Sequence, residues 1–239
     1  MDILIRALNL KKNYKIGKIV IPALNGVSFE VSKGEFLAIN GRSGSGKSTL
    51  LNLLGLLDEP TEGELIMDGH EMVKFSEKEK TKFRLQSIGF VFQFFNLIEN
   101  YTAIENITFQ LKLQGLGNSE SKRRAEDIIE FLGLKDRAYF FPREMSGGEQ
   151  QRVAIGRAIA KESLLILVDE PTAHLDDKNS QIIINLLGEI NRKFGRTIVL
   201  VTHEEKEASE ADRIITLQDG RIIKNEKNIS NSHKTKLIV

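Results

Sequence analysis

The sequence has no cysteine and no tryptophan, and only four of its 239 residues are proline. The absence of cysteine excludes a disulfide framework, a thiolate zinc site and a cysteine nucleophile. No apolar run approaches the ~18–20 residues that cross a bilayer, and residues 1–6 lack the basic start and long apolar run of a signal peptide. We therefore expect the chain to be soluble by itself, so that any role at a membrane requires a partner.

The chain also lacks an excess of charge of either sign, because 34 Lys and Arg residues against 33 Asp and Glu residues leave a formal net charge of +1. This balance gives no support to nucleic-acid binding through bulk electrostatics. Apolar residues make up 41% of the chain and charged residues 28%, which excludes a disordered chain and a coiled-coil rod. The length suffices for one large domain with a real hydrophobic core, or for a domain with a sizeable insertion.

Four short apolar runs predict buried strands, because they are continuous and do not alternate with polar residues. These runs are residues 36–39, 88–92, 164–168 and 198–201. Helical spacing of apolar residues follows residue 48 and recurs over 120–132 and 178–194. Strands that alternate with helices predict an α/β core with a parallel sheet.

The two ends of the chain have a different pattern. Residues 3–9 and 27–32 predict shorter, more exposed strands of an antiparallel flank, and Asp219-Gly220 between two apolar segments predicts a β-hairpin. The segment 94–160 is mostly helical in pattern and is predicted to be a subdomain inserted into the α/β core. We expect one domain over residues 1–223, followed by a polar, flexible tail over 224–239.

A glycine-rich loop over residues 41–49 follows the first predicted core strand and precedes a leucine-striped helix. It matches the phosphate-loop pattern G-x-x-x-x-G-K-[ST], whose glycines let backbone N–H groups turn toward phosphate oxygens at a helix N-terminus. Lys47 can reach the β- and γ-phosphates, and Ser48 can ligate Mg²⁺. The predicted nucleotide-binding residues of this loop are Gly41, Ser43, Gly44, Ser45, Gly46, Lys47, Ser48 and Thr49.

Polar residues also follow the other three predicted core strands. Gln93 follows the second, Asp169 and Glu170 follow the third, and His203 follows the fourth. Ligands of open parallel sheets bind beyond the carboxyl ends of the strands, so we expect these side chains along one edge with the phosphate loop. Asp169 is predicted to bind Mg²⁺, because a carboxylate beside a phosphate needs a cation between them. Glu170 can orient or deprotonate the attacking water, and His203 is expected to contact the γ-phosphate.

A second candidate anion site lies at residues 145–152, before another apolar-striped helix. Ser146 can cap this helix, and Glu149 three residues later can complete a capping box. Gly147 and Gly148 expose backbone N–H groups at the positive end of the helix. A plain helix cap is the alternative. Two phosphate-binding elements with one Mg²⁺ carboxylate pair predict a composite site, in which one element faces a phosphate held by a second subunit.

In their order and spacing, these motifs resemble those of ATP-binding cassette (ABC) ATPases over residues 3–223. The Ser-Gly-Gly signature distinguishes that family from kinases and other phosphate-loop enzymes. The resemblance implies a P-loop NTPase core with a mixed, mostly parallel sheet, an N-terminal antiparallel β flank and an inserted helical subdomain. It also implies ATP and Mg²⁺ as cofactors, and a homodimer in which the phosphate loop of one subunit and the signature of the other sandwich the nucleotide.

The resemblance implies further roles, residue by residue. Tyr14 resembles the aromatic residue that stacks on adenine, Glu170 the catalytic glutamate, and His203 the switch histidine. Asp176 resembles the acidic residue of the loop that crosses the dimer interface. Gln93 resembles the residue that binds Mg²⁺ and the γ-phosphate and links them to the membrane partner.

Segments 90–98 and 101–107 resemble one subgroup most closely, namely the ATPases of lipoprotein release, macrolide efflux and antimicrobial-peptide resistance. The resemblance implies a peripheral ATPase on the cytoplasmic face of the membrane that drives a separate integral permease for efflux or release. An ABC ATPase that signals across the membrane without transport, such as a cell-division scaffold, is the alternative. An ABC protein acting on DNA or ribosomes is disfavoured, because the chain has one phosphate loop and no long coiled-coil insertion before the signature.

Four apolar residues come just after Gln93, namely Phe94, Phe95, Leu97 and Ile98. They lie in the segment with which the resembled subgroup receives the cytoplasmic helix of its permease, so the resemblance implies a hydrophobic docking groove here. The alternative is that these residues belong to the ordinary core of the subdomain.

Four residues depart from the family pattern. Arg42 stands where the subgroup usually has proline, and it adds a charge beside the phosphates. Met145 replaces leucine at similar volume, and Glu149 is a common variant of glutamine. His174 stands where a small residue or asparagine is commoner, and its effect on the dimer interface is left open by the sequence. None of these substitutions removes a catalytic group.

Overall fold

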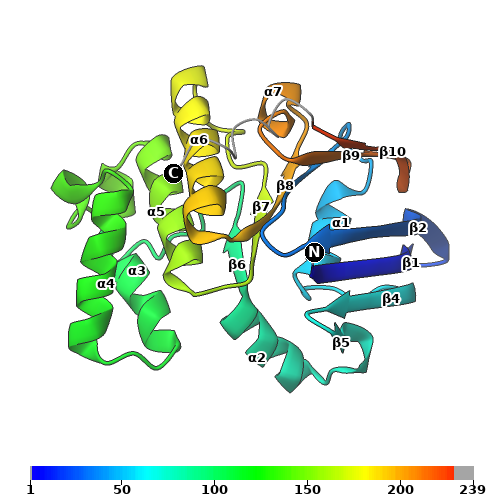
Figure 1. The fold of residues 1–239 in the computed structure, drawn as a ribbon, viewed down its shortest axis with the longest axis horizontal. Helices are drawn as coiled ribbons and strands as arrows, with labels where there is room; N and C mark the ends of the chain where they lie inside the picture. The colour runs from blue at the N-terminus through cyan, green and yellow to red at the C-terminus, as the bar shows by residue number, and fades with distance from the viewer. Residues whose placement is uncertain (1, 229–239) are drawn as a thin grey trace. The chain divides into compact units, whose positions relative to one another are not determined.

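Residues 2–228 are described by the computed structural model (Figure 1). They form two units, of which unit 1 takes up residues 2–81 and 186–228 and unit 2 takes up Lys82–Asn185. The two junctions fall within helices α2 (Glu77–Ser87) and α6 (Asp177–Phe194).

Unit 1 begins with a long hairpin of strands β1 (Ile3–Ile16) and β2 (Ile19–Ser32), which Figure 1 shows beside β4 (Glu62–Met67) and β5 (His70–Glu71). The four strands form an antiparallel sheet in the order β2-β1-β4-β5. The flanking strands are therefore longer than the predicted segments 3–9 and 27–32. Gly17, at φ +60°, allows the chain to reverse between Ile16 and Ile19, so that pairing continues to the tip of the hairpin.

Unit 1 also contains four strands of a mixed sheet, in the order β10-β9-β3-β8. Strand β3 (Phe36–Asn40) is parallel to both β8 (Thr197–Thr202) and β9 (Arg213–Gln218), whereas β10 (Arg221–Lys227) is antiparallel to β9. The three apolar residues Leu37, Ala38 and Ile39 in β3 are fully buried, as the continuous run predicts.

The predicted hairpin at Asp219-Gly220 is confirmed, with φ angles of 49° and 70° that suit a type I′ turn. Strand β10 continues to Lys227 and so includes the first residues of the tail that the sequence predicts from residue 224. Residues 229–239 of that predicted tail lie outside the described residues.

Unit 2 contains the parallel pair β6 (Ile88–Val91) and β7 (Leu165–Asp169). Between them lie the helices α3 (Ala103–Leu113), α4 (Asn118–Phe131) and α5 (Gly147–Ala160), which contact one another, and two short 3₁₀ turns. Gly156 lets α5 approach its neighbours, because a Cβ there would lie 2.7 Å from Leu132 Cδ1 and 2.8 Å from Ile107 Cδ1. The segment 94–160, which the sequence predicts to be mostly helical, contains these three helices.

The strand and helix pattern agrees with the predicted α/β class, including a mixed sheet and an antiparallel flank. Helix α1 (Lys47–Leu54) follows β3 after the glycine-rich loop, and the short helix α7 (Glu205–Ala208) follows β8. Among the described residues, no helix is both long enough and apolar enough to cross a membrane.

Candidate nucleotide site

The glycine-rich loop joins the carboxyl end of β3 to the start of α1 in unit 1. A Cβ at Gly41 would lie 2.4 Å from the carbonyl oxygen of Leu217, and one at Gly46 would lie 2.5 Å from that of Ala23. Both neighbours are backbone atoms that cannot move aside, and Gly46 also has a φ of +101°. Glycine is therefore required at both ends of the loop by contact with the surrounding strands and turns.

The side chains of the loop are arranged around its own backbone. Lys47 is only 5% exposed, and its Nζ donates hydrogen bonds to the carbonyl oxygens of Gly41 at 2.8 Å and Arg42 at 3.1 Å. Ser45 Oγ is buried and has no hydrogen-bond partner, whereas Ser43 and Ser48 are exposed. The ammonium group of Lys47 is thus held inside the curve of the loop, where a phosphate oxygen can replace the carbonyl contacts.

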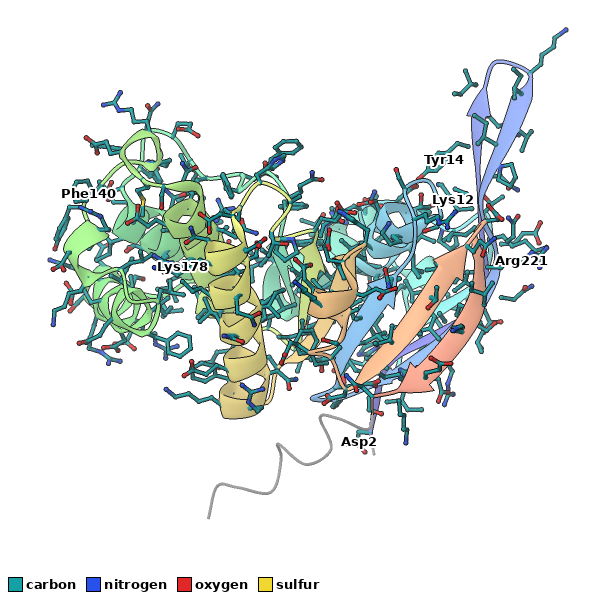
Figure 2. All side chains as sticks on the ribbon, turned by 90° about the horizontal axis from the view of Figure 1, so that it is seen from above. Asp2, Lys12, Tyr14, Phe140, Lys178 and Arg221 are labelled. Carbon is teal, nitrogen blue, oxygen red and sulfur yellow. The ribbon has the colours of Figure 1, made fainter. Side chains whose placement is uncertain are left out.

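Tyr14 lies on the β1–β2 hairpin beside Lys12, as Figure 2 shows. Its hydroxyl donates a hydrogen bond to Asp58 Oδ2 at 2.9 Å and also contacts the side chain of Thr49, in the first turns of α1. Partial burial raises the pKa of Tyr14 above its ordinary value; Asp58 adds to this rise and Thr49 opposes it. Unit 1 therefore brings the predicted adenine-stacking residue to the helix that follows the phosphate loop.

His203 follows the last residue of β8 in the same unit. Because β3 and β8 pair in parallel with Asn40 opposite Thr202, the phosphate loop and His203 both start at one edge of this sheet. The imidazole is half-exposed, and its Nε2 lies 3.3 Å from Glu204 Oε1. The exposed ring remains accessible from solvent at that edge.

Asp169 is the last residue of strand β7 in unit 2, and Glu170 follows it. Parallel pairing of Val91 with Val168 places Gln93 at the same end of this strand pair as Asp169. The backbone φ of Glu170 is 39°, in the left-handed region that a residue with a side chain adopts at a cost of about 1 kcal/mol or more. Such strained conformations cluster at functional sites. The strand therefore ends in a sharp turn that sets Glu170 apart from the extended backbone of Asp169.

The residues of the signature form the N-terminus of α5 as the capping-box pattern predicts. Ser146 Oγ accepts the backbone N–H of Glu149 at 3.3 Å, and Glu149 Oε2 accepts the backbone N–H of Ser146 at 2.8 Å. Arg137 Nε donates to Glu149 Oε1 at 3.2 Å. Burial raises the pKa of Glu149, but the hydrogen bonds from Ser146 and Arg137 outweigh it and hold this pKa below its ordinary value.

Asp176 forms a second N-terminal cap, at the start of α6. Its Oδ1 accepts the backbone N–H of Asn179 and its Oδ2 accepts the Asn179 side-chain amide, both at 2.8 Å. These hydrogen bonds, led by the one from the backbone, lower the pKa of Asp176. Asn179 also lies against the signature, since a Cβ at Gly148 would be 2.5 Å from Asn179 Oδ1. Unit 2 thus brings the predicted interface loop and the predicted trans-acting signature together.

Gln93 contacts a residue for which the sequence indicated no contact. Its side-chain Nε2 lies 3.4 Å from His174 Nε2, and the imidazole of His174 lies 5.0 Å from the ring centroid of Phe94. Buried Gln151 reaches the carbonyl oxygen of Phe92, one residue before Gln93, at 3.4 Å.

Sequence reasoning missed three of these partners for related reasons. Asp58, His174 and Gln151 carry no motif by themselves, and each meets its partner across many residues of chain. Asn179 could have been found, because Asp followed by Asn three residues later at the start of an apolar-striped helix is a capping pattern. Asp176 thus has a structural role in addition to the predicted one.

The residues present fit Mg-ATP on observations within each unit. The loop over 41–49 has glycine where neighbouring backbone passes too close for a Cβ, and it contains a buried Ser45 hydroxyl without a hydrogen-bond partner and an exposed Ser48 hydroxyl. Asp169 supplies a carboxylate oxygen of the kind that Mg²⁺ prefers. Among residues 2–228, no cluster of three or more His, Asp or Glu side chains could hold a metal by itself.

Comparison with known proteins shows the family of the chain. The family model described as ABC transporter matches residues 24–173. An ABC transporter ATP-binding protein of Thermotoga maritima is 44% identical over 211 residues, which cover 88% of this chain and 90% of the relative. The protein YvrO of Bacillus subtilis, also an ABC transporter ATP-binding protein, is 42% identical over 219 residues, which cover 92% of this chain and 95% of the relative.

Solved structures of ATP-binding cassettes are also similar to this chain. Two dimeric structures of the ATP-binding cassette MJ0796, one in a post-hydrolysis state bound to ADP and Pi, have TM-scores of 0.88 and 0.87. Both are 42% identical to this chain and cover 94% of it and 99% of their own length. The cbiO1 protein of Clostridium perfringens has a TM-score of 0.87 at 28% identity.

The chain belongs to the ABC transporter family of ATP-binding proteins. It is an ATPase, and its cofactors are ATP and Mg²⁺.

Proposed function

We propose that this ATPase dimerises around two Mg-ATP molecules and drives a conformational change in a separate integral membrane permease, for the efflux or release of a substrate. It acts from the cytoplasmic face of the membrane. Within the ABC family, segments 90–98 and 101–107 favour the subgroup of lipoprotein release, macrolide efflux and antimicrobial-peptide resistance.

Bound Mg-ATP supplies the reactive γ-phosphate, and side chains of this protein hold it and activate water. Lys47, whose Nζ contacts loop carbonyls, would bind phosphate oxygens in their place, and Ser48 and Asp169 would hold the metal ion. Glu170, displaced from the line of β7 by its left-handed backbone, orients and deprotonates the attacking water. His203 contacts the γ-phosphate from the end of β8.

The dimer is supported by the signature cap and by the relatives. Helix α5 presents free backbone N–H groups of Gly147 and Gly148 at its positive end, and Ser146 is exposed there. MJ0796, which is similar to this chain over nearly its whole length, forms dimers. We place these N–H groups against the γ-phosphate bound by the partner subunit, with Asp176 in the loop that crosses the interface.

The observation that carries the link to a permease is the exposure of Phe94, which is 66% accessible immediately after Gln93. Phe95, Leu97 and Ile98 are half-buried, so none of the four belongs to the fully buried core. A large apolar side chain beside a predicted γ-phosphate contact is suited to receive an apolar helix of a partner and to transmit its movement. This arrangement favours a docking surface over the alternative of ordinary core.

The test is isolation of the ATPase from native membranes, followed by identification of co-purifying integral membrane proteins. Phe94→Glu is expected to abolish recovery of the permease, because a charge would have to be desolvated within an apolar contact. Tyr139→Glu is the matched control, since Tyr139 is an aromatic residue of the same unit that is 69% exposed. Equal recovery of the permease with both variants would exclude the proposed surface.

Reconstitution of the purified pair in vesicles then separates transport from signalling. Release or movement of a substrate that depends on ATP hydrolysis supports the proposal. An ATPase that the permease stimulates without any movement of substrate supports the alternative of signalling across the membrane.

A further inference from the structure

His174 lies in the turn that follows the end of β7. The turn is closed by backbone hydrogen bonds from Ala173 to Glu170 at 3.3 Å and from Leu175 to Thr172 at 2.9 Å. The ring is therefore carried by backbone whose course is set within a few residues of Glu170. A movement of this turn would move the imidazole with it.

The imidazole contacts two consecutive residues of the segment after β6. Its Nε2 lies 3.4 Å from Gln93 Nε2, and its ring lies 5.0 Å from that of Phe94 at an angle of 31°. A neutral imidazole accepts a hydrogen bond from an amide N–H when its other nitrogen carries the proton. The separation is at the long end of hydrogen bonds, so this contact is a modest one that orients Gln93.

We infer that His174 is a positioning residue that holds the side-chain amide of Gln93 and joins it to the turn containing Glu170. This inference rests on the proposed role of Gln93 at Mg²⁺ and the γ-phosphate. Gln93 has three side-chain torsions, and in the absence of a partner its amide has many orientations to lose when the transition state forms. Contact with His174 removes part of that cost before the reaction.

The ring contact with Phe94 gives the same residue a second role. Phe94 is exposed on the proposed docking surface, so His174 contacts both the predicted permease-binding side chain and the predicted γ-phosphate contact. A shift of Phe94 on docking would move the ring that orients Gln93. Basal hydrolysis and its response to the permease should therefore both depend on His174.

The experiment measures kcat and KM for Mg-ATP in the full-length chain. His174→Ala is expected to lower kcat about three- to tenfold, which corresponds to loss of one modest hydrogen bond, with little change in KM. His174→Phe keeps an aromatic ring but no nitrogen, and its kcat should fall as far. His174→Gln keeps a hydrogen-bonding amide without the ring, and it should retain most of kcat. Wild-type kcat in His174→Phe would overturn the inference.

A double-mutant cycle with Gln93→Ala shows whether His174 acts through Gln93. If it does, His174→Ala should cause no further loss of kcat in the Gln93→Ala background. Independent, multiplicative losses would overturn the inference and leave the proposed function intact. Wild-type kcat in Gln93→Ala would instead contradict the proposed role of Gln93 itself. Thermal unfolding of each variant identifies any loss of folded protein, and if His174→Ala does not fold, the Phe and Gln variants decide the outcome.

Discussion

The phosphate-loop lysine has structural contacts as well as its predicted function. Lys47 is almost fully buried, and its Nζ donates to two carbonyl oxygens of the loop. Residues at such sites serve both the fold and the ligand, so a substitution changes stability together with binding. The effect on ATP binding and the effect on the free energy of unfolding can be measured separately, because binding should be lost altogether whereas the loss of stability should be small.

Lys47→Ala should abolish ATP binding while the protein stays folded. The charge that reaches the phosphates is removed, and the lost contacts with Gly41 and Arg42 lower the free energy of unfolding by about 1–2 kcal/mol. Calorimetric titration with Mg-ATP and urea unfolding measure these two quantities. Lys112→Ala, at an exposed position in the last turn of α3, is the control. Wild-type affinity for Mg-ATP in Lys47→Ala would contradict the assignment of the loop.

At the scale of elements, the N-terminus of α5 combines a helix cap with a predicted phosphate contact. Ser146 and Glu149 exchange hydrogen bonds there. Serine satisfies both the plain cap and the signature interpretation, so the cap geometry alone does not distinguish them.

Substitution of Ser146 separates the cap from the phosphate contact. Ser146→Ala removes the acceptor of the Glu149 N–H and should lower the free energy of unfolding by about 1 kcal/mol. Ser146→Asp restores an acceptor and should recover most of that stability. Its carboxylate would repel the γ-phosphate, so ATPase activity should be lost even though the helix is capped. Urea unfolding measures the stability of each variant, and steady-state hydrolysis measures its activity. An active Ser146→Asp variant would show that Ser146 serves only as the helix cap.

The opposite end of α5 contains a buried cation. Lys161, just after the helix, donates a 2.8 Å hydrogen bond to the carbonyl oxygen of Ile88 at the start of β6. Burial, helped by the charge of Arg157, lowers the pKa of Lys161 from 10.5 to about 8. Between these pH values the unfolded chain binds more protons than the folded one, so this group makes the protein more stable as pH rises.

The contribution of Lys161 to the free energy of unfolding should rise between about pH 8 and 10.5, by at most about 3 kcal/mol. Urea unfolding of wild type and Lys161→Met at several pH values measures it, because methionine keeps an apolar stem but does not titrate. As pH rises over this range, the free energy of unfolding of wild type should increase relative to that of Lys161→Met. Lys112→Met is the control, and its free energy of unfolding should depend on pH as that of wild type does. If Lys161→Met also showed the pH dependence of wild type, the assignment of this dependence to Lys161 would be wrong.

At the scale of the whole molecule, the proposed site is completed by a second copy of the chain. Each loop that is proposed to face phosphate presents backbone N–H groups or a lysine, so two such surfaces gain little from each other without an anion between them. ATP supplies the negative charge that both can bind.

Glu170→Gln should therefore dimerise with Mg-ATP and return to monomer with ADP. The amide keeps the size of the side chain but cannot deprotonate water, so hydrolysis is blocked while binding remains. Size-exclusion chromatography with multi-angle light scattering measures the mass in each nucleotide. Addition of Lys47→Ala to this variant is the control and should keep it monomeric. Normal hydrolysis by Glu170→Gln would remove the catalytic assignment, and a monomer at saturating Mg-ATP would argue against the sandwich.

The sequence by itself determined the features that depend on short-range pattern. Continuous apolar runs predicted β3, β6, β7 and β8, and the capping box at Ser146 and Glu149 was readable from a spacing of three residues. The dipeptide Asp219-Gly220 predicts a turn because apolar segments flank it, whereas the same dipeptide at Asp68-Gly69, with φ of 48° and 79°, carries no such signal. Strand β5 after it has only two residues and provides no apolar run to mark a hairpin.

Only the tertiary structure decided which distant side chains meet. The contact of Gln93 with His174 spans 81 residues of chain, and that of Tyr14 with Asp58 spans 44. Spacing along the chain has no information about such pairs, because the parallel register of β6 with β7 and the path of each turn set them. The sequence marked His174 as a departure from the family, and the fold showed its contacts, because a turn that closes on Glu170 carries the ring to Gln93.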